Sequence, residues 1–391
     1  MLTITKMERE QQFADIEPKL LLWARESIGL SLEEVSKQVK AGKEVINEWE
    51  SGKKKPTLTQ IRKLSKIYKR PLAVFYLSEP PKEPPLPKDF RTIPSDKVNP
   101  LSTKTRLAVR RARRLQSLAS ELTEEKVKLL FPRIKITDNI NNIINQVREQ
   151  FNISIEAQFK WKDETEAFNE WRRLIENQGI FIFQIGMPKE DGVRGFSFIE
   201  NGPPAIVLNL RDAINGRIFS LFHEYAHICL NNSGLCDMKE GSDLSGNDKK
   251  IEQFCNYFAG SLLVPEQALL ENRIVHSKGY SEDWTNDELK RIAKDFKVSQ
   301  EVILRRLLIL KYTSTNFYQQ KREEWESIKK EKRGGRQNPP KKCIQGNGVP
   351  FVSLVLESYK KEKITYNDVA DYLSLRFKYI PKVEKIIQGN P

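Results

Sequence analysis

The stretch from Gly216 to Leu230, "GRIFSLFHEYAHICL", decides how the middle of the chain folds. Its apolar residues recur every three or four positions, which is the pattern of a helix that buries one face. Successive helical residues are rotated by about 100°, so His223 and His227 lie about 40° apart, one turn from each other. The stretch therefore predicts a buried helix on which two imidazoles can hold one ion together.

The residue after the first histidine makes this pair specific for zinc chemistry. Glu224 projects beside His223, where it can reach a water on the ion rather than the ion itself, as in the His-Glu-x-x-His zinc site. Two neutral imidazoles and one further protein ligand suit Zn²⁺ and leave a position open for that water. The chain has only three histidines, which argues against a chance pattern. We expect Glu224 to act as general base in the hydrolysis of a peptide bond.

The third ligand has two candidates by residue type. His276 in "NRIVHSKGY" is the remaining histidine, but its segment lacks a strong helical pattern and we interpret it as a surface residue. In "KKIEQFCNYFAGSLLVPEQ", Glu252 and Asn256 stand four positions apart on one helical face. Glu252 can bind the metal while Asn256 supplies a supporting hydrogen bond, although a solvated Glu and Asn pair has the same spacing. We favour the carboxylate.

Residues 180–210 change in character just before the motif. "IFIFQI", "RGFSFIE" and "PAIVLNL" are short runs of β-branched and aromatic residues separated by Gly and Pro, and they predict a small sheet. An extended peptide can add to a sheet edge and satisfy its backbone hydrogen bonds there. We expect a substrate strand to pair with an edge near 196–208.

Residues 18–77 are predicted to form a set of short helices with clear start signals. Ser31 with Glu34, and Thr57 with Gln60, have the spacing of capping boxes. Two short helices joined by a tight turn inside a five-helix unit follow the helix-turn-helix plan, whose second helix can enter the major groove. A small bundle that binds protein, or binds nothing, fits the pattern equally well.

The stretch "LSLEEVSKQVKAGKEVINEWESGKKKPTLTQIRKLSKIYKRPL" resembles the XRE (Cro/repressor-like) helix-turn-helix family, notably in the W-E-x-G-x-x-x-P-T run from Trp49 to Thr57. Gly42 replaces the usual hydroxyl cap, and Glu44, Glu48 and Glu50 place three acids on the recognition helix. Lysines after this helix can bind the DNA backbone without reading its sequence. The resemblance implies these DNA-binding residues: Lys43, Glu44, Asn47, Lys53, Lys54 and Lys55.

The motif helix and the segment after it resemble the ImmA/IrrE family of zinc metallopeptidases. "FSLFHEYAHICL" is followed by "EQFCNYFAGSLLVP", which matches the family's second motif, E-x-x-A-N-x-F-A-x-x-L-L-x-P. Cys255 replaces the alanine and Val264 the common methionine, while every position expected to touch zinc or water is filled. The resemblance implies that His223, His227 and Glu252 bind zinc and that Glu224 is the base.

The order of domains is also similar to an arrangement found in that family, over roughly residues 18–312. Its members are known as site-specific proteases that cut helix-turn-helix repressors of mobile elements and stress-response genes. The resemblance thus implies a zinc-dependent regulatory endopeptidase that cleaves a transcriptional repressor. The alternative is a non-catalytic DNA-binding regulator or antitoxin whose metal site is structural or sensory.

We expect an α+β, mostly α-helical fold: a five-helix helix-turn-helix domain, then a zincin-like helical domain with a small β-sheet. Residues 274–320 again read as helix, turn, helix, either a second DNA-binding unit or a support for the catalytic domain, and we favour the support. The expected divisions are 1–77 (helix-turn-helix), 78–100 (proline-rich linker), 101–273 (metallopeptidase), 274–320 (support), 321–349 (basic flexible loop) and 350–391 (C-terminal helices).

Composition limits the remaining choices. The 391 residues carry a formal charge of +14, which favours polyanionic partners such as double-stranded DNA. Four cysteines without a CxxC pair argue against both a disulfide framework and a thiolate zinc site. The sequence has neither a signal-peptide pattern nor an apolar run of about 18 residues, so we expect a cytoplasmic protein without a membrane partner.

Overall fold

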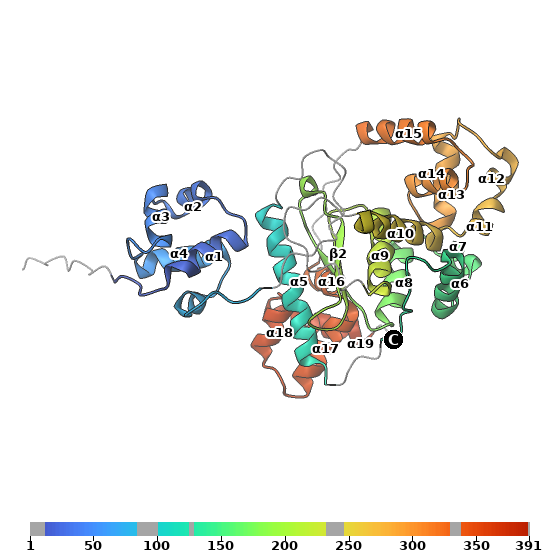
Figure 1. The fold of residues 1–391 in the computed structure, drawn as a ribbon. Coiled ribbons are helices and arrows are strands. Elements are labelled where there is room, and N and C mark those ends of the chain that lie inside the picture. The colour runs from blue at the N-terminus through green and yellow to red at the C-terminus, as the bar shows by residue number, and fades with distance from the viewer. Residues whose placement is uncertain (1–11, 84–100, 125–128, 232–245, 329–337, 390–391) are drawn as a thin grey trace, which may run out of the picture. The chain divides into compact units, whose positions relative to one another are not determined.

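The structure is a computed structural model that describes residues 12–83, 101–124, 129–231, 246–328 and 338–389 (Figure 1). The described chain forms two compact units, one of residues 12–83 with 101–110 and one from residue 111 onward. Both are mostly α-helical, and the second also contains a small sheet. The expected α+β fold class is confirmed.

The first unit contains four α-helices and a 3-10 helix, together with the beginning of a long fifth α-helix. Both predicted capping boxes are present, with Ser31 and Thr57 each accepting from the backbone N–H three residues on. Gly42 begins the third helix without a side-chain cap. The elements are α1 (Pro18–Ser27), α2 (Leu32–Val39), α3 (Lys43–Glu50), α4 (Leu58–Tyr68), η1 (Leu72–Tyr76) and α5 (Thr103–Leu122).

A buried ion pair links α1 to α3. Arg25 donates to both carboxylate oxygens of Glu50 at 2.8 and 2.9 Å, and the two side chains are only 13% and 5% exposed. Hydrogen bonding to Glu50 raises the pKa of Arg25 despite its burial. Glu50 therefore serves the core of this unit and is not an acid on the exposed face of α3.

Replacing Glu50 by alanine should lower the free energy of unfolding of the first unit by about 3 kcal/mol, because Arg25 would keep a buried charge without its partner. Amide hydrogen exchange of residues 18–76 in the full chain measures this loss. Glu48→Ala is the matched control on the same helix and should change stability by less than about 0.5 kcal/mol. Equal exchange in the two variants would contradict the assigned role of the ion pair.

The second unit follows along the chain from the remainder of α5. Its elements are α6 (Ile140–Phe151), α7 (Ile155–Lys160), α8 (Glu164–Glu176), β1 (Phe181–Ile185), η2 (Lys189–Asp191), β2 (Gly195–Phe198), β3 (Ala205–Asn209), α9 (Ile214–Cys229), α10 (Gly246–Leu263), α11 (Glu266–Leu270), α12 (Arg273–Lys278), α13 (Asn286–Phe296), α14 (Gln300–Ile309), α15 (Thr315–Ile328), α16 (Pro339–Asn347), α17 (Val349–Lys360), α18 (Tyr366–Tyr372), η4 (Phe377–Tyr379) and α19 (Ile380–Gln388).

The sheet has the strand order β1-β3-β2, with β3 parallel to β1 and antiparallel to β2. Of the stretch 196–208 expected to contain the substrate edge, only residues 196–198 lie in an edge strand, β2, because residues 205–208 belong to the central strand; pairing of a substrate there stays a prediction. Among the described residues, β2 packs mainly against β3 on one side and against α9 through one face. Strand β2 forms the other edge of the described sheet.

The outer edge of β1, in contrast, is covered. The carbonyl of Ile182 accepts a hydrogen bond from Arg172 of α8, and the side chain of Gln184 donates to the carbonyl of Gln345 in α16 at 2.9 Å. A Cβ on Gly346 would lie 3.5 Å from the carbonyl oxygen of Gln184, so α16 runs close along this strand. Within the described residues, the β1 edge of the sheet is therefore closed to a further strand.

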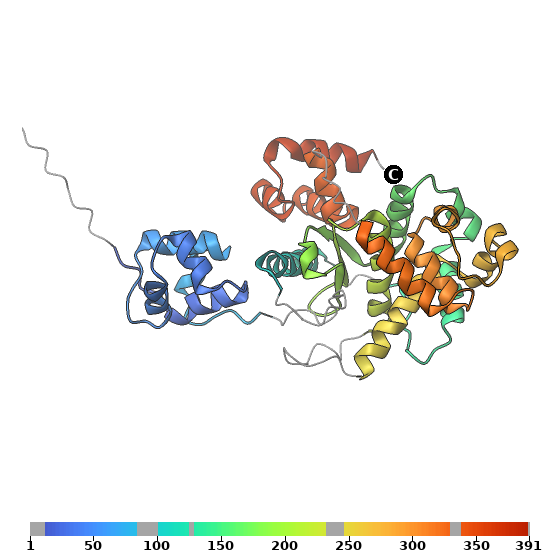
Figure 2. The same ribbon diagram turned by 90° about the horizontal axis from the view of Figure 1, so that it is seen from above.

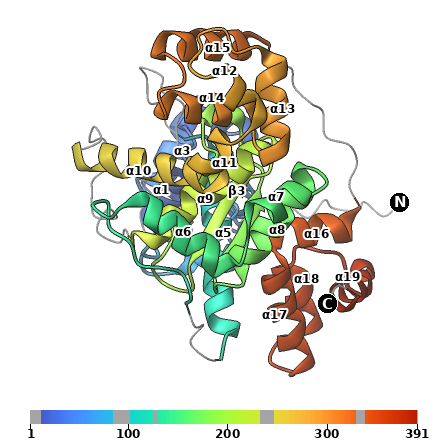
Figure 3. The same cartoon turned by 90° about the vertical axis from the view of Figure 1, so that its right-hand side faces the viewer.

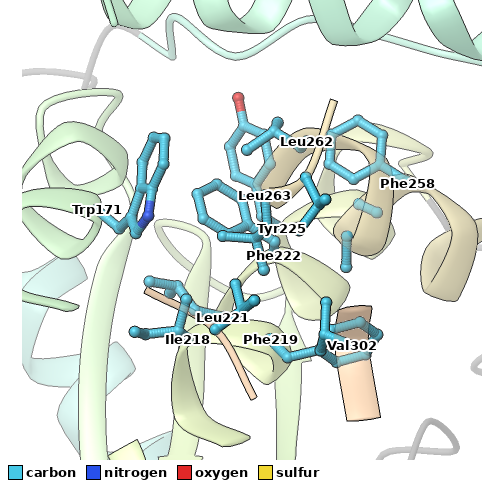
Figure 4. Close-up of a cluster of buried hydrophobic side chains, with 14 of the residues drawn as sticks. Trp171, Ile218, Phe219, Leu221, Phe222, Tyr225, Phe258, Leu262, Leu263 and Val302 are labelled. Atoms are coloured by element: carbon cyan, nitrogen blue, oxygen red, sulfur yellow. The ribbon is translucent and has the colours of Figure 1, made fainter. Parts of the chain in front are cut away.

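One hydrophobic core surrounds α9. Figure 4 shows side chains of α8, α9, α10 and α14 packed together, among them Trp171, Phe222, Phe258 and Val302. Ile206 and Leu208 of β3 join the same core from the sheet. Because α13 and α14 contribute to this core, the packing favours a support role for residues 274–320.

The C-terminal helices occupy another region of the second unit. Figures 2 and 3 show α16–α19 in red, well separated from α13–α15 in orange. Phe351 of α17 packs edge-on against Phe181 and Phe183 of β1, with ring centroids 6.4 and 5.6 Å apart. These aromatic contacts place α17 on the face of β1 that is turned away from the α9 core.

The expected basic loop at 321–349 is wrong for most of its length. Helix α15 continues to Ile328, and a further helix, α16, occupies 339–347; residues 329–337 lie outside the described part. The two prolines of "NPP" stand at the first positions of α16, where a missing N–H costs nothing and the fixed φ suits a helix. They begin a helix here, where a basic flexible loop was expected.

Candidate metal centre

Helix α9 is buried on nearly all sides, between the sheet, α8 and α10. Its side chains from Arg217 to Cys229 are all buried, and His223, Glu224 and His227 are at most 1% exposed. Burial of three polar side chains in an apolar core is unfavourable unless each finds a partner or an ion. The buried polar side chains of α9 therefore indicate a binding site in the core.

The two histidines and Glu252 of α10 converge on one point. The Nε2 atoms of His223 and His227 are 3.1 Å apart, and they lie 3.2 and 3.1 Å from the two carboxylate oxygens of Glu252. Ligand atoms about 2.0–2.2 Å from a tetrahedral zinc ion would be about 3.3–3.5 Å from one another. The donor types and their separations fit a zinc ion, and these three residues are the one such cluster in the described chain.

The two imidazoles stabilise the charged form of Glu252. Burial raises the pKa of the Glu252 carboxyl, but hydrogen bonds from His223 and His227 together with their charges lower it more. The net pKa lies well below the ordinary range of a glutamate. Asn256 follows one turn later on α10 and is half-buried, whereas His276 lies exposed on α12, outside the cluster.

Glu224 is held by the sheet and does not take part in the ligand cluster. Its Oε2 accepts a hydrogen bond of 2.9 Å from the hydroxyl of Ser197 in β2. A Cβ added to Gly195 would lie 3.4 Å from Cγ of Glu224 and 3.0 Å from the carbonyl oxygen of Val207. Sequence reasoning missed Ser197; the signal was the two-residue alternation in "RGFSF", which puts Gly195 and Ser197 on one face of the strand.

Of the predicted DNA-binding residues, Lys43, Glu44 and Asn47 lie on α3, and Lys53, Lys54 and Lys55 lie in the turn after it. Lys43 is paired with Glu33 of α2, and Lys55 with Asp15 at 2.8 Å. The other four of the set are exposed and form no ion pair with described residues: Glu44, Asn47, Lys53 and Lys54. The two lysines of the turn are therefore available to a phosphate backbone.

Comparison with known families agrees with this geometry. Residues 21–75 match a helix-turn-helix family model, and residues 175–308 match a peptidase family model described as the IrrE N-terminal-like domain. The chain joins these two domains in that order. No curated protein matches the chain.

The IrrE N-terminal-like domain, as matched, begins at the end of α8 and ends within α14. It contains the sheet, the motif helix α9 and Glu252, and it includes α13. The C-terminal helices α16–α19 lie beyond the matched segment. Within the described chain, no helix is both long and apolar enough to cross a membrane.

Proposed function

We propose that this protein is a cytoplasmic zinc-dependent endopeptidase that cleaves a protein partner, with a helix-turn-helix transcriptional repressor as the expected substrate. The observation that carries the proposal is the convergence of His223, His227 and Glu252, with Glu224 buried beside them. The match of residues 175–308 to the IrrE N-terminal-like domain supports it.

In this proposal His223, His227 and Glu252 hold the zinc ion. When bound, the ion supplies a Lewis acid for the scissile carbonyl and lowers the pKa of a water molecule. Glu224 accepts a proton in the addition step and gives it to the leaving amine, so that one carboxylate serves as base and then as acid. Its burial strengthens these interactions, because little bulk water competes for the carboxylate.

Strand β2 is an edge strand of the described sheet, and this position supports an extended segment as substrate. A peptide strand that adds to β2 would pass beside Glu224, which the same strand contacts through Ser197. A helical segment cannot pair in this way. We therefore expect cleavage in a linker or a locally unfolded part of the partner.

The helix-turn-helix domain supports a role near DNA. Its match to the family model and the exposed Lys53 and Lys54 favour binding to a phosphate backbone, which would bring the peptidase to a repressor bound on its operator. These observations also keep the non-catalytic regulator as a second candidate. That candidate predicts operator binding that survives Glu224→Gln, is lost with Asn47→Ala, and occurs without proteolysis of any partner.

Elemental analysis of the purified wild-type chain, with no metal added, tests the proposed function first. We expect about one zinc per chain, because three protein ligands and an open position are the usual set of a catalytic site. A chain that contains no zinc, even after reconstitution at neutral pH, would contradict the peptidase and leave the DNA-binding regulator.

A further inference from the structure

We propose that Ser197 is a positioning residue for Glu224, and that strand β2 thereby sets the orientation of the base. The inference rests on the proposed function and adds to it a residue outside both sequence motifs. It gives strand β2, which borders the site, a part in orienting the catalytic base.

The contact itself is specific. The hydroxyl of Ser197 donates to Oε2 of Glu224 at 2.9 Å, from a half-buried position to a fully buried one. The terminal torsion of a glutamate is broad, so a hydrogen bond to one oxygen narrows the orientations of the carboxylate plane. A hydrogen bond to a charged acceptor is stronger than one between neutral groups, and it fixes one oxygen of the carboxylate.

The sheet holds Ser197 in place. Ser197 is paired with Ile206 and Gly195 with Leu208, and both of these β3 side chains lie in the core around α9. The strand approaches so closely that a Cβ at position 195 would touch Cγ of Glu224 at 3.4 Å. The hydroxyl is thus presented by a paired strand, and such rigid elements position functional groups more accurately than loops do.

This arrangement couples two parts of the proposed reaction. Strand β2 lies at an edge of the described sheet, and its inner face holds Glu224. A peptide paired with β2 and the carboxylate held by Ser197 would therefore take their positions from the same four residues, 195–198. Loss of the hydroxyl should disturb the base without disturbing the metal ligands.

The test measures binding of acetohydroxamate to the zinc-loaded chain by calorimetry. A hydroxamate ligates zinc and also hydrogen-bonds to a neighbouring carboxylate, so its affinity reports the position of Glu224 without any substrate. We expect Ser197→Ala to weaken binding about tenfold, the size of one charge-assisted hydrogen bond that is no longer well aligned. Ser197→Thr, which keeps the hydroxyl, should restore it, and zinc uptake should stay the same in all variants.

A double-mutant cycle separates positioning from general damage. If Ser197 acts through Glu224, then Ser197→Ala combined with Glu224→Ala, which removes the acceptor, should bind acetohydroxamate no more weakly than Glu224→Ala alone. Ser261→Ala is the matched control, because Ser261 is buried on α10 and its hydroxyl has no partner among the described residues; it should leave the affinity unchanged.

Three results in the Ser197 variants would overturn the inference. Unchanged affinity in Ser197→Ala shows that the hydroxyl does not position the base, and additive losses in the double variant show that it acts independently of Glu224. A fall in zinc uptake that follows Ser197→Ala would likewise replace positioning by a structural role. A wild-type chain that takes up no zinc would instead overturn the proposed function, and this inference with it.

Discussion

Replacing Glu224 by glutamine should lower the rate of cleavage about a thousandfold while leaving the zinc in place. The amide keeps the size of the side chain and can still accept from Ser197, but it cannot take up the proton that general base catalysis requires. New N-termini in the proteome fraction incubated with each chain, counted by mass spectrometry, measure cleavage. Elemental analysis of the same samples measures zinc.

A matched acid provides the control for this experiment. Glu200 is exposed just after β2, so Glu200→Gln removes the same charge without touching the site and should cleave like the wild type. Unchanged cutting by Glu224→Gln would reject the assigned base. Loss of zinc along with activity would show that Glu224 acts as a ligand, against the geometry of the cluster.

Replacing His227 by alanine should remove the zinc itself, from about one ion per chain to below about a tenth, and all cleavage with it. The Nε2 atom of His227 lies 3.1 Å from both His223 Nε2 and a Glu252 oxygen, so the substitution removes one of three converging ligands. The two ligands that remain cannot hold the ion against solvent. Elemental analysis after purification measures the loss directly.

The third histidine is the natural control. His276 lies exposed on α12, away from the cluster, so His276→Ala should keep the zinc of the wild type. Zinc that persists in His227→Ala would contradict the assigned ligand set. Zinc lost from His276→Ala would show a second site that the geometry does not predict.

The parts of the fold that the sequence predicted are those with local causes. Capping boxes at Ser31 and Thr57 involve residues three positions apart, and the histidine pair involves one helical turn. Such features depend on the dihedral angles of a few residues and survive without knowledge of the tertiary fold. Glu252 is different, because its approach to the histidines depends on how α10 packs on α9.

The parts that the sequence did not predict have non-local causes. Ser197 meets Glu224 only because β2 pairs antiparallel with the central strand β3 and both strands pack against α9. The wrong prediction of a loop at 321–349 has a simpler reason. A pair of prolines ends one helix or begins the next according to position, and their type alone does not distinguish the two.

The unequal edges of the sheet also limit how this molecule can associate with others. Fibril growth by strand pairing needs two open edges on every subunit, one to receive and one to offer. In the described residues, α16 and Arg172 close the β1 side of the sheet, which leaves at most the β2 side for strand pairing. A second copy docked there would terminate the stack at a pair, so the fold can keep an edge strand beside its site without becoming a template for polymerisation.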